Sequence, residues 1–355
     1  MKRNIYMVLG MIMTGIVILP SCKKDFEKIN TDPNTSPTAL PEQLLAPALV
    51  NTLTVNMLRS RTFNNELMQV TVNETDGEGA VFRYDIRANQ ADYPWNNWYQ
   101  QLSNFKDIYK IASQPITLNK GYQGIGLICQ SWVYSLLTDT FGDIPYFHSN
   151  EARDSLIYEP PFDKQKDIYL DIFKQLELAN TLLTGAANVK AASDPVFNGN
   201  CAEWRKFGNS LYLRLLMRVS GKAEISAQVI AKIKEIVDTD PADYPIMTSN
   251  ADAAVLRWTG SGYLLSPFIN GVREQDWRQP ALTSFFINNL TKWADPRLFQ
   301  GSWSIATYNG GYVGVPSGYA AGTAPVGKSY FLSTTSPKTL ETEPLMGNIM
   351  NYAEL

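Results

Sequence analysis

The chain has 355 residues, of which 45% are hydrophobic and 12% aromatic, so it can bury the core of one large domain or two. Its formal net charge of −3 argues against nucleic acid as a partner. The single histidine, His148, excludes a multi-histidine zinc site, and no Gly-rich phosphate loop follows a strand pattern, so we expect neither a metal nor another cofactor.

The N-terminus has the pattern of an exported protein. Two basic residues are followed by the apolar run Met7–Leu19, which is long enough for a secretory signal but short of the ~20 residues that span a bilayer. The run Leu19–Cys22 (LPSC) resembles the lipobox of bacterial lipoproteins, in which the cysteine thiol receives a diacylglycerol. We therefore predict a signal peptide over residues 1–21 and lipidation of Cys22. The alternative is an ordinary cleaved signal followed by a chance cysteine.

Residues 22–41 are predicted to form a lipidated N-terminus and an extended tether, because the stretch from Asp25 to Pro41 is rich in Asn, Thr, Ser and Pro. Residues 42–355 are predicted to form one helical domain. No second apolar run approaches bilayer length, so we expect the lipid to be the only attachment to the membrane.

Stripes of apolar residues at helical spacing follow the tether, and they recur in pairs. This pattern predicts stacked antiparallel hairpins of the tetratricopeptide kind. The helix near Trp98 should pair with that near Trp132, and the helix near Ile172 with that near Leu211. The stripes cover Leu45–Met57, Trp98–Ala112, Ile125–Leu137, Ile168–Leu183, Phe207–Val219 and Ile225–Val237.

Two cysteines remain after lipidation, Cys129 and Cys201, and both lie within the helical stripes or beside them. In an exported protein, the oxidising environment could convert these two thiols to a disulfide. We favour buried free thiols over that alternative.

The pattern changes between Asp240 and Leu345, where Gly, Ser, Thr and Pro alternate with aromatic residues and only Ser284–Trp293 looks helical. A segment this long without regular structure is typical of a functional loop region, and its aromatics argue against disorder. The predicted fold is therefore mainly α: tetratricopeptide-like helical hairpins (an alpha-alpha superhelix) with a large irregular loop region and few short strands.

Several segments resemble the SusD/RagB family of surface glycan-binding lipoproteins, and their spacing most resembles its second SusD-like subgroup. Leu137–Tyr146 (LTDTFGDIPY) is similar to the signature of the family, and Trp204–Leu215 (WRKFGNSLYLRL) to its Trp-x-Lys-Phe-Ala-Asn-Ser-Leu helix. Phe26–Asn34 resembles the segment after the lipid cysteine, and Ala294–Arg297 a further tetrapeptide of the family.

The LTDTFGDIPY run also has a structural interpretation. Gly142 can end the preceding helix as a left-handed cap, and Pro145 prevents the helix from resuming. Asp139 and Asp143 are placed to bond turn amides. We therefore interpret the run as the corner of a helical hairpin rather than as a sugar site.

Other notable side chains are also predicted to be structural. Arg214 and Arg218 share one face of a helix, and we expect them to pair with carboxylates such as Glu177 and to stabilise the core. Trp98 and Trp132 lie on helix stripes and are predicted to be buried.

The resemblance implies a non-catalytic, lipid-anchored protein of the outer membrane that faces the cell surface. Members of the family cap a TonB-dependent porin of the SusC type and deliver oligosaccharides, or in some cases peptides, into it. It therefore implies a SusC-like porin and a nutrient as partners. The identity of the nutrient and any calcium dependence stay open.

Glycan capture needs aromatic faces against the C–H faces of sugar rings, and a few such anchors carry most of the affinity. We predict Trp277, Trp303 and Tyr308, which lie among Gly, Ser, Asn and charged residues, and Trp95, which lies between Pro94 and a helix. No family motif assigns a role to these positions. Further candidates are Tyr84, Tyr93, Trp258, Tyr263, Tyr312, Tyr319 and Tyr330, with Arg83, Arg87 and Asn96 as polar neighbours, although Trp258 and Tyr263 could be strand residues packed on the helices.

Two alternatives remain at this stage. One is a glycosidase that uses two carboxylates ~5–9 Å apart, for which no motif stands out. The other is a helical-repeat scaffold that binds only protein. The run Tyr352–Glu354 resembles one that opens a long helix in the family, so we also expect the sequence to be a fragment that lacks C-terminal hairpins.

Overall fold

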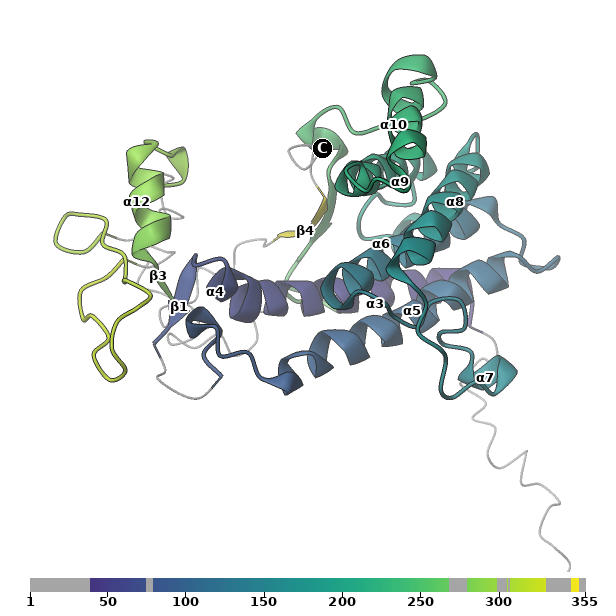
Figure 1. The fold of residues 1–355 in the computed structure, drawn as a ribbon. Helices are drawn as coiled ribbons and strands as arrows, with labels where there is room; N and C mark the ends of the chain where they lie inside the picture. The colour runs from purple at the N-terminus through teal and green to yellow at the C-terminus, as the bar shows by residue number, and fades with distance from the viewer. Residues whose placement is uncertain are drawn as a thin grey trace, which may run out of the picture. The chain divides into compact units, whose positions relative to one another are not determined.

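The computed structural model describes residues 39–74, 79–267, 280–298, 305, 307–329 and 346–350 (Figure 1). Cys22, the predicted signal peptide and almost all of the tether lie outside these residues, as do Trp277 and Trp303. All elements named below belong to the unit Leu40–Leu355.

The structure is mainly helical, as predicted, and each apolar stripe lies in a helix. α3 begins at Pro41, a first helical position that suits proline. The sixth stripe continues beyond α10 into a π turn, Glu235–Thr239. The helices are α3 (Pro41–Arg59), α4 (Asn65–Leu67), α5 (Asp92–Ala112), α6 (Lys120–Phe141), α7 (Ala152–Ser155), α8 (Gln165–Leu183), α9 (Cys201–Val219), α10 (Ser226–Lys234) and α12 (Ser284–Lys292).

Side-chain caps and a glycine fix the ends of the two central helices. The Asn119 side chain accepts a hydrogen bond from a backbone amide of the first turn of α6, and Asn200 does the same at α9. Gly142 ends α6 with a φ of 79°, as predicted, but its ψ of −120° differs from the left-handed helical cap that we expected. Only glycine adopts this conformation readily.

The predicted helical hairpins are present. α5 packs against α6, and α8 packs against α9, while α3 covers α5 and α6 also contacts α8 (Figure 1). The shared core includes Leu102, Phe105 and Trp204, which are fully buried. Gly126 lets α6 approach α5, because a Cβ at this position would lie 3.3 Å from the carbonyl oxygen of Phe105.

Both cysteines within the described residues are buried free thiols. Cys129 lies inside α6 and Cys201 is the first residue of α9. The prediction of free thiols in place of a disulfide is confirmed.

The described strands form two small antiparallel sheets. β1 (Thr71–Asn73) pairs with β3 (Pro280–Leu282), and β2 (Ala254–Arg257) pairs with β4 (Met346–Met350). The irregular region takes part in two small apolar clusters: one joins it to Val72 and Phe82, and the other lies around Leu290 on α12. Few short strands were predicted, and this is what the structure has.

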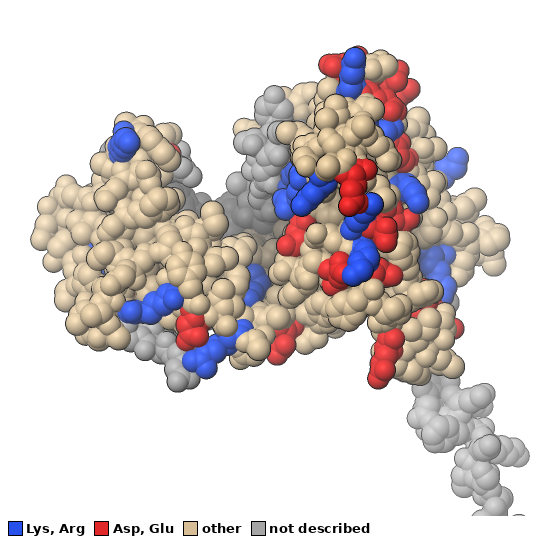
Figure 2. Space-filling view, viewed as in Figure 1, with Lys and Arg blue, Asp and Glu red and all other residues tan. Residues whose placement is uncertain are grey.

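Basic and acidic side chains lie side by side over α8, α9 and α10 on the face drawn in Figure 2. Lys232 pairs with Glu177 on α8 and with Glu235, and Lys166 pairs with Glu224. The charges on this surface therefore largely compensate one another.

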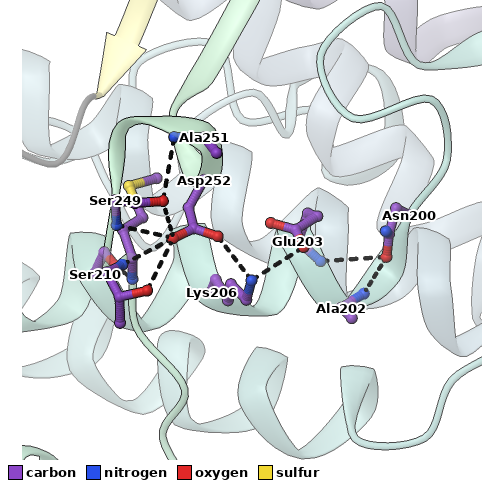
Figure 3. Close-up of polar contacts among 10 residues, drawn as sticks. Asn200, Ala202, Glu203, Lys206, Ser210, Ser249, Ala251 and Asp252 are labelled. Carbon is purple, nitrogen blue, oxygen red and sulfur yellow. Dashed lines mark hydrogen bonds and ion pairs between the residues drawn. The ribbon is translucent and has the colours of Figure 1, made fainter.

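A polar network joins the segment before β2 to α9 (Figure 3). One oxygen of Asp252 lies 2.7 Å from Nζ of Lys206, and the other accepts hydrogen bonds from the amides of Thr248 and Ser249. Lys206 and these amides hold the pKa of Asp252 well below its usual range. The side chain of Ser210 accepts a further bond from the backbone just before this segment. The polar residues of the WRKFGNSLYLRL helix thus position β2.

The corner after α6 is structural, as predicted, but a different aspartate bonds its amides. Oδ2 of Asp163 accepts hydrogen bonds from the amides of Tyr146 and Phe147, both at 2.9 Å. Asp143 instead accepts a bond from the amide of Gln165, at the start of α8. The sequence could not show this, because Asp163 reaches the corner only after an intervening loop.

Candidate functional site

The main described cavity lies among α3, the start of α5, the end of α6 and α9. Its volume is about 670 Å³, which is within the range of small-molecule sites. A π turn, Ser60–Asn64, continues α3 along its wall, and a short helical turn, Ala88–Gln90, precedes α5 there.

One part of the cavity wall is aromatic. Trp98 and Trp132 line it with only 6% and 2% of their surface exposed, so the prediction that both belong to the core is confirmed. Nε1 of Trp98 donates a hydrogen bond to Oδ1 of Asn56 at 2.9 Å. Phe63 and Phe141 complete the aromatic lining. Because Trp98 and Trp132 are almost fully buried, the accessible apolar faces of this lining come from Phe63 and Phe141, and faces of this kind pack against sugar rings.

Trp95 stands next to this wall and is partly buried. Its ring meets Phe141 edge-on, with centroids 5.1 Å apart, and stacks on Phe162 with centroids 6.1 Å apart. The Tyr99 ring also contacts it. Because Phe162 is exposed and Phe141 lines the cavity, these rings connect the surface with the cavity wall.

The lining of the cavity also carries charged side chains. Four arginines line it, together with one carboxylate, Asp139. Arg59 donates hydrogen bonds to Oε1 and to the backbone oxygen of Gln90, at 3.0 and 2.6 Å, and lies over the ring of Phe63. Burial lowers the pKa of Arg59 below its ordinary value.

Arg218 pairs with a carboxylate, as predicted, but the carboxylate is Asp139 and not Glu177. NH1 of Arg218 lies 2.7 Å from Oδ2 of Asp139, and the hydroxyl of Tyr169 donates to Oδ1 at 2.5 Å. Asp139 therefore binds side chains of α8 and α9, and not the turn amides that we expected. Glu177 pairs with Lys232 and accepts a hydrogen bond from Tyr244.

The two longest motifs of the resemblance meet at this cavity. Asp139 and Phe141 come from LTDTFGDIPY at the end of α6, and Arg214 comes from the WRKFGNSLYLRL helix. Besides their structural roles, both motifs thus contribute side chains to this cavity. Their sequences do not show this, because the cavity forms only when the helices pack in one bundle.

A second cavity, of about 470 Å³, lies on the other side of the Asp139–Arg218 ion pair. Tyr169, Lys166 and Lys222 contribute to its lining. The two cavities therefore share Asp139 and Arg218 in their linings, and the second has one aromatic lining residue, Tyr169.

Among the described candidates, Arg87 lines the main cavity, whereas the aromatic residues Tyr308, Trp258 and Tyr263 do not. Tyr308 is 38% exposed, lies in a tight turn that it closes with Gly311, and lines none of the described cavities. Trp258 is 1% exposed and packs in the main core directly after β2, which favours its interpretation as a packed strand residue. Tyr263 is exposed.

Within the described ranges, no group of His, Cys, Asp and Glu side chains is placed to hold a metal ion. None of the helices in the part of the chain that the structure describes combines the length and the apolarity needed to cross a bilayer.

Comparison with known proteins identifies relatives. A SusD-like family model, described as starch-binding and associating with the outer membrane, matches residues 33–355. No curated protein sequence matches the chain.

Solved structures show the same fold. A chitin-binding protein superposes with a TM-score of 0.65 at 24% identity, covering 88% of this chain and 67% of its own. A chitin-binding SusD homologue from Flavobacterium johnsoniae has a TM-score of 0.65 at 21% identity (88% and 63%), and a SusD homologue from Bacteroides fragilis has 0.67 at 23% (89% and 66%). The chain thus spans about two thirds of the length of these structures.

Proposed function

The chain belongs to the SusD-like family of starch-binding proteins that associate with the outer membrane, and from this premise we propose that it binds an oligosaccharide nutrient at the cell surface. The observation that carries the proposal is the cavity of about 670 Å³, whose lining combines aromatic rings with guanidinium groups. Aromatic faces pack on sugar rings, and guanidinium groups donate hydrogen bonds to their hydroxyls.

Lipidation of Cys22 would attach the protein to the outer membrane, with its folded part in water. Two or more acyl chains make such an attachment stable, at ~0.8 kcal/mol for each buried methylene. A TonB-dependent porin of the SusC type would receive the nutrient.

We propose binding without catalysis. Asp139 is the sole carboxylate among the residues that line the cavity, and it is already bonded to Arg218 and Tyr169. A glycosidase would need a second carboxylate ~5–9 Å away.

The binding site is tested by replacing Trp95. We expect Trp95→Ala to weaken oligosaccharide binding by about 2 kcal/mol, because it removes the ring that supports Phe141 at the cavity wall. Calorimetric titration with malto- and chito-oligosaccharides measures the change. Trp293→Ala is the matched control, since Trp293 is 65% exposed and lines none of the described cavities.

Equal loss of affinity in both variants would place the ligand elsewhere. Trp303→Ala, measured in the same series, tests our sequence prediction of a ligand contact at a position outside the described residues. If the unmodified protein binds no oligosaccharide while its deletion still abolishes uptake, the scaffold alternative is correct.

A further inference from the structure

The described lining of the cavity has a positive formal charge, whereas the full sequence has a negative one. The full sequence has a net charge of −3, and the surface over α8–α10 mixes both signs (Figure 2). The cavity, however, is lined by Arg59, Arg87, Arg214 and Arg218 against Asp139 alone. Arg87 is further paired with Asp85, just outside the lining. The formal charge of the described lining is therefore positive.

Arg59 is the informative member of this set. Within the described residues its partners are neutral: the side chain and backbone oxygen of Gln90 and the ring of Phe63. Burial already disfavours its charge, and an arginine keeps that charge at neutral pH. A partly buried guanidinium of this kind is stabilised by an anion that enters the cavity.

Arg218 approaches the same cavity from α9. Its partner Asp139 also accepts a hydrogen bond from Tyr169, so one carboxylate serves two donors. The side chain of Arg218 is 52% exposed, which leaves part of its guanidinium accessible. Arg59 and Arg218 thus line one space together with the rings of Phe63 and Phe141.

We propose that the cavity binds an acidic oligosaccharide, with a carboxylate or sulfate ester of the sugar held by Arg59 and its ring faces packed on the aromatic wall. This inference rests on the proposed function and names its ligand class. Guanidinium groups bind planar carboxylates in a bidentate manner, and a volume of about 670 Å³ accommodates a short oligosaccharide.

The test compares trigalacturonate with its methyl ester, which has the same shape but no charge. Calorimetric titration of the full chain should show that the acid binds at least about tenfold more tightly, and that only its affinity falls as NaCl is raised. A sulfated trisaccharide distinguishes the two sources of the anionic group. Arg59→Gln should lower the affinity for the acid about tenfold and leave that for the ester unchanged.

Arg153→Gln is the matched control, because it removes the same charge from an exposed site that pairs with Asp107 and Asp154 outside the cavity. If the ester binds as tightly as both acidic probes, the acidic ligand class is wrong and the proposed function stands. If none of these sugars nor any neutral oligosaccharide binds, both are wrong. Equal binding of tri-glutamate would replace the sugar by an acidic peptide. The comparison of acid with ester uses the unmodified protein, so it holds even if Arg59→Gln fails to fold.

Discussion

Glu66, on α4, is a buried carboxylic acid whose pKa is raised to about 7, mainly by burial and against the opposing effect of the Phe82 amide. Its unfolded value is 4.5, so the folded protein holds the proton more tightly. The contribution of Glu66 to stability is therefore greatest below about pH 4.5 and is lost as the pH rises through about 7. We expect Glu66→Gln to remove this loss and to stabilise the protein at pH 8 by at most about 3 kcal/mol. Urea unfolding of the variant and of the unmodified protein at pH 5 and pH 8 measures this difference in the free energy of unfolding.

The control for this prediction is Glu159→Gln, at an exposed acid. It should leave the pH dependence as it is in the unmodified protein. If Glu66→Gln has the same dependence of stability on pH as the unmodified protein, Glu66 is already ionised in the folded protein at pH 5.

Residue pairings were the least predictable part of the site. Helical spacing correctly placed Arg214 and Arg218 on one helix face, but spacing does not show which neighbouring helix supplies the carboxylate. Asp139 reaches Arg218 from the last turn of α6, whereas Glu177 faces Lys232. Such pairs depend on helix rotation and offset, which the sequence of one chain does not contain.

At the scale of elements, Gly124 sets the distance between α6 and α8. A Cβ at this position would lie 2.5 Å from Cγ of Leu183, so either this side chain or the two helices would have to shift. We expect Gly124→Ala to destabilise the fold by about 1–3 kcal/mol, although alanine favours a helix by about 1 kcal/mol. Thermal and chemical unfolding measure the loss.

Gly221→Ala is the control, because a Cβ there would meet no atom within 4 Å. Adding Leu183→Ala to Gly124→Ala should cost less than the two single changes together, since the smaller side chain makes room for the new methyl group. Strictly additive effects would show that the crowding at Gly124 is relieved in another way.

The helices were predictable because long apolar stripes and caps such as Asn119 and Asn200 report local structure. The positions of the strands were not predictable, because strands as short as Thr71–Asn73 carry almost no periodicity. The partner of that strand begins at Pro280, far along the chain, and its register depends on contacts between distant segments. The cavity was missed for the same reason, since it exists only once four helical segments have packed.

At the scale of the whole molecule, net charge indicates the class of partner but does not indicate the local charge of the cavity. A net charge of −3 argues against polyanionic partners such as nucleic acid, and it does so by averaging over the chain. The cavity concentrates arginines that the average conceals. Net charge therefore predicts long-range behaviour, whereas the ligand responds to the local field within roughly one Debye length, about 8 Å at physiological salt.

The attachment of the whole molecule to a membrane depends, in our proposal, on one atom, the thiol of Cys22. Without its acyl chains we expect Cys22→Ala to leave the membrane fraction and be recovered in the soluble fraction, because no other segment of the sequence has an apolar run of bilayer length. Fractionation and incorporation of labelled palmitate measure this. Cys129→Ala, which changes a buried free thiol, should stay membrane-bound and labelled. If Cys22→Ala keeps both label and membrane attachment, the lipobox interpretation is wrong and the acyl chains are attached to another residue; if it keeps membrane attachment without label, the protein reaches the membrane by binding a partner there.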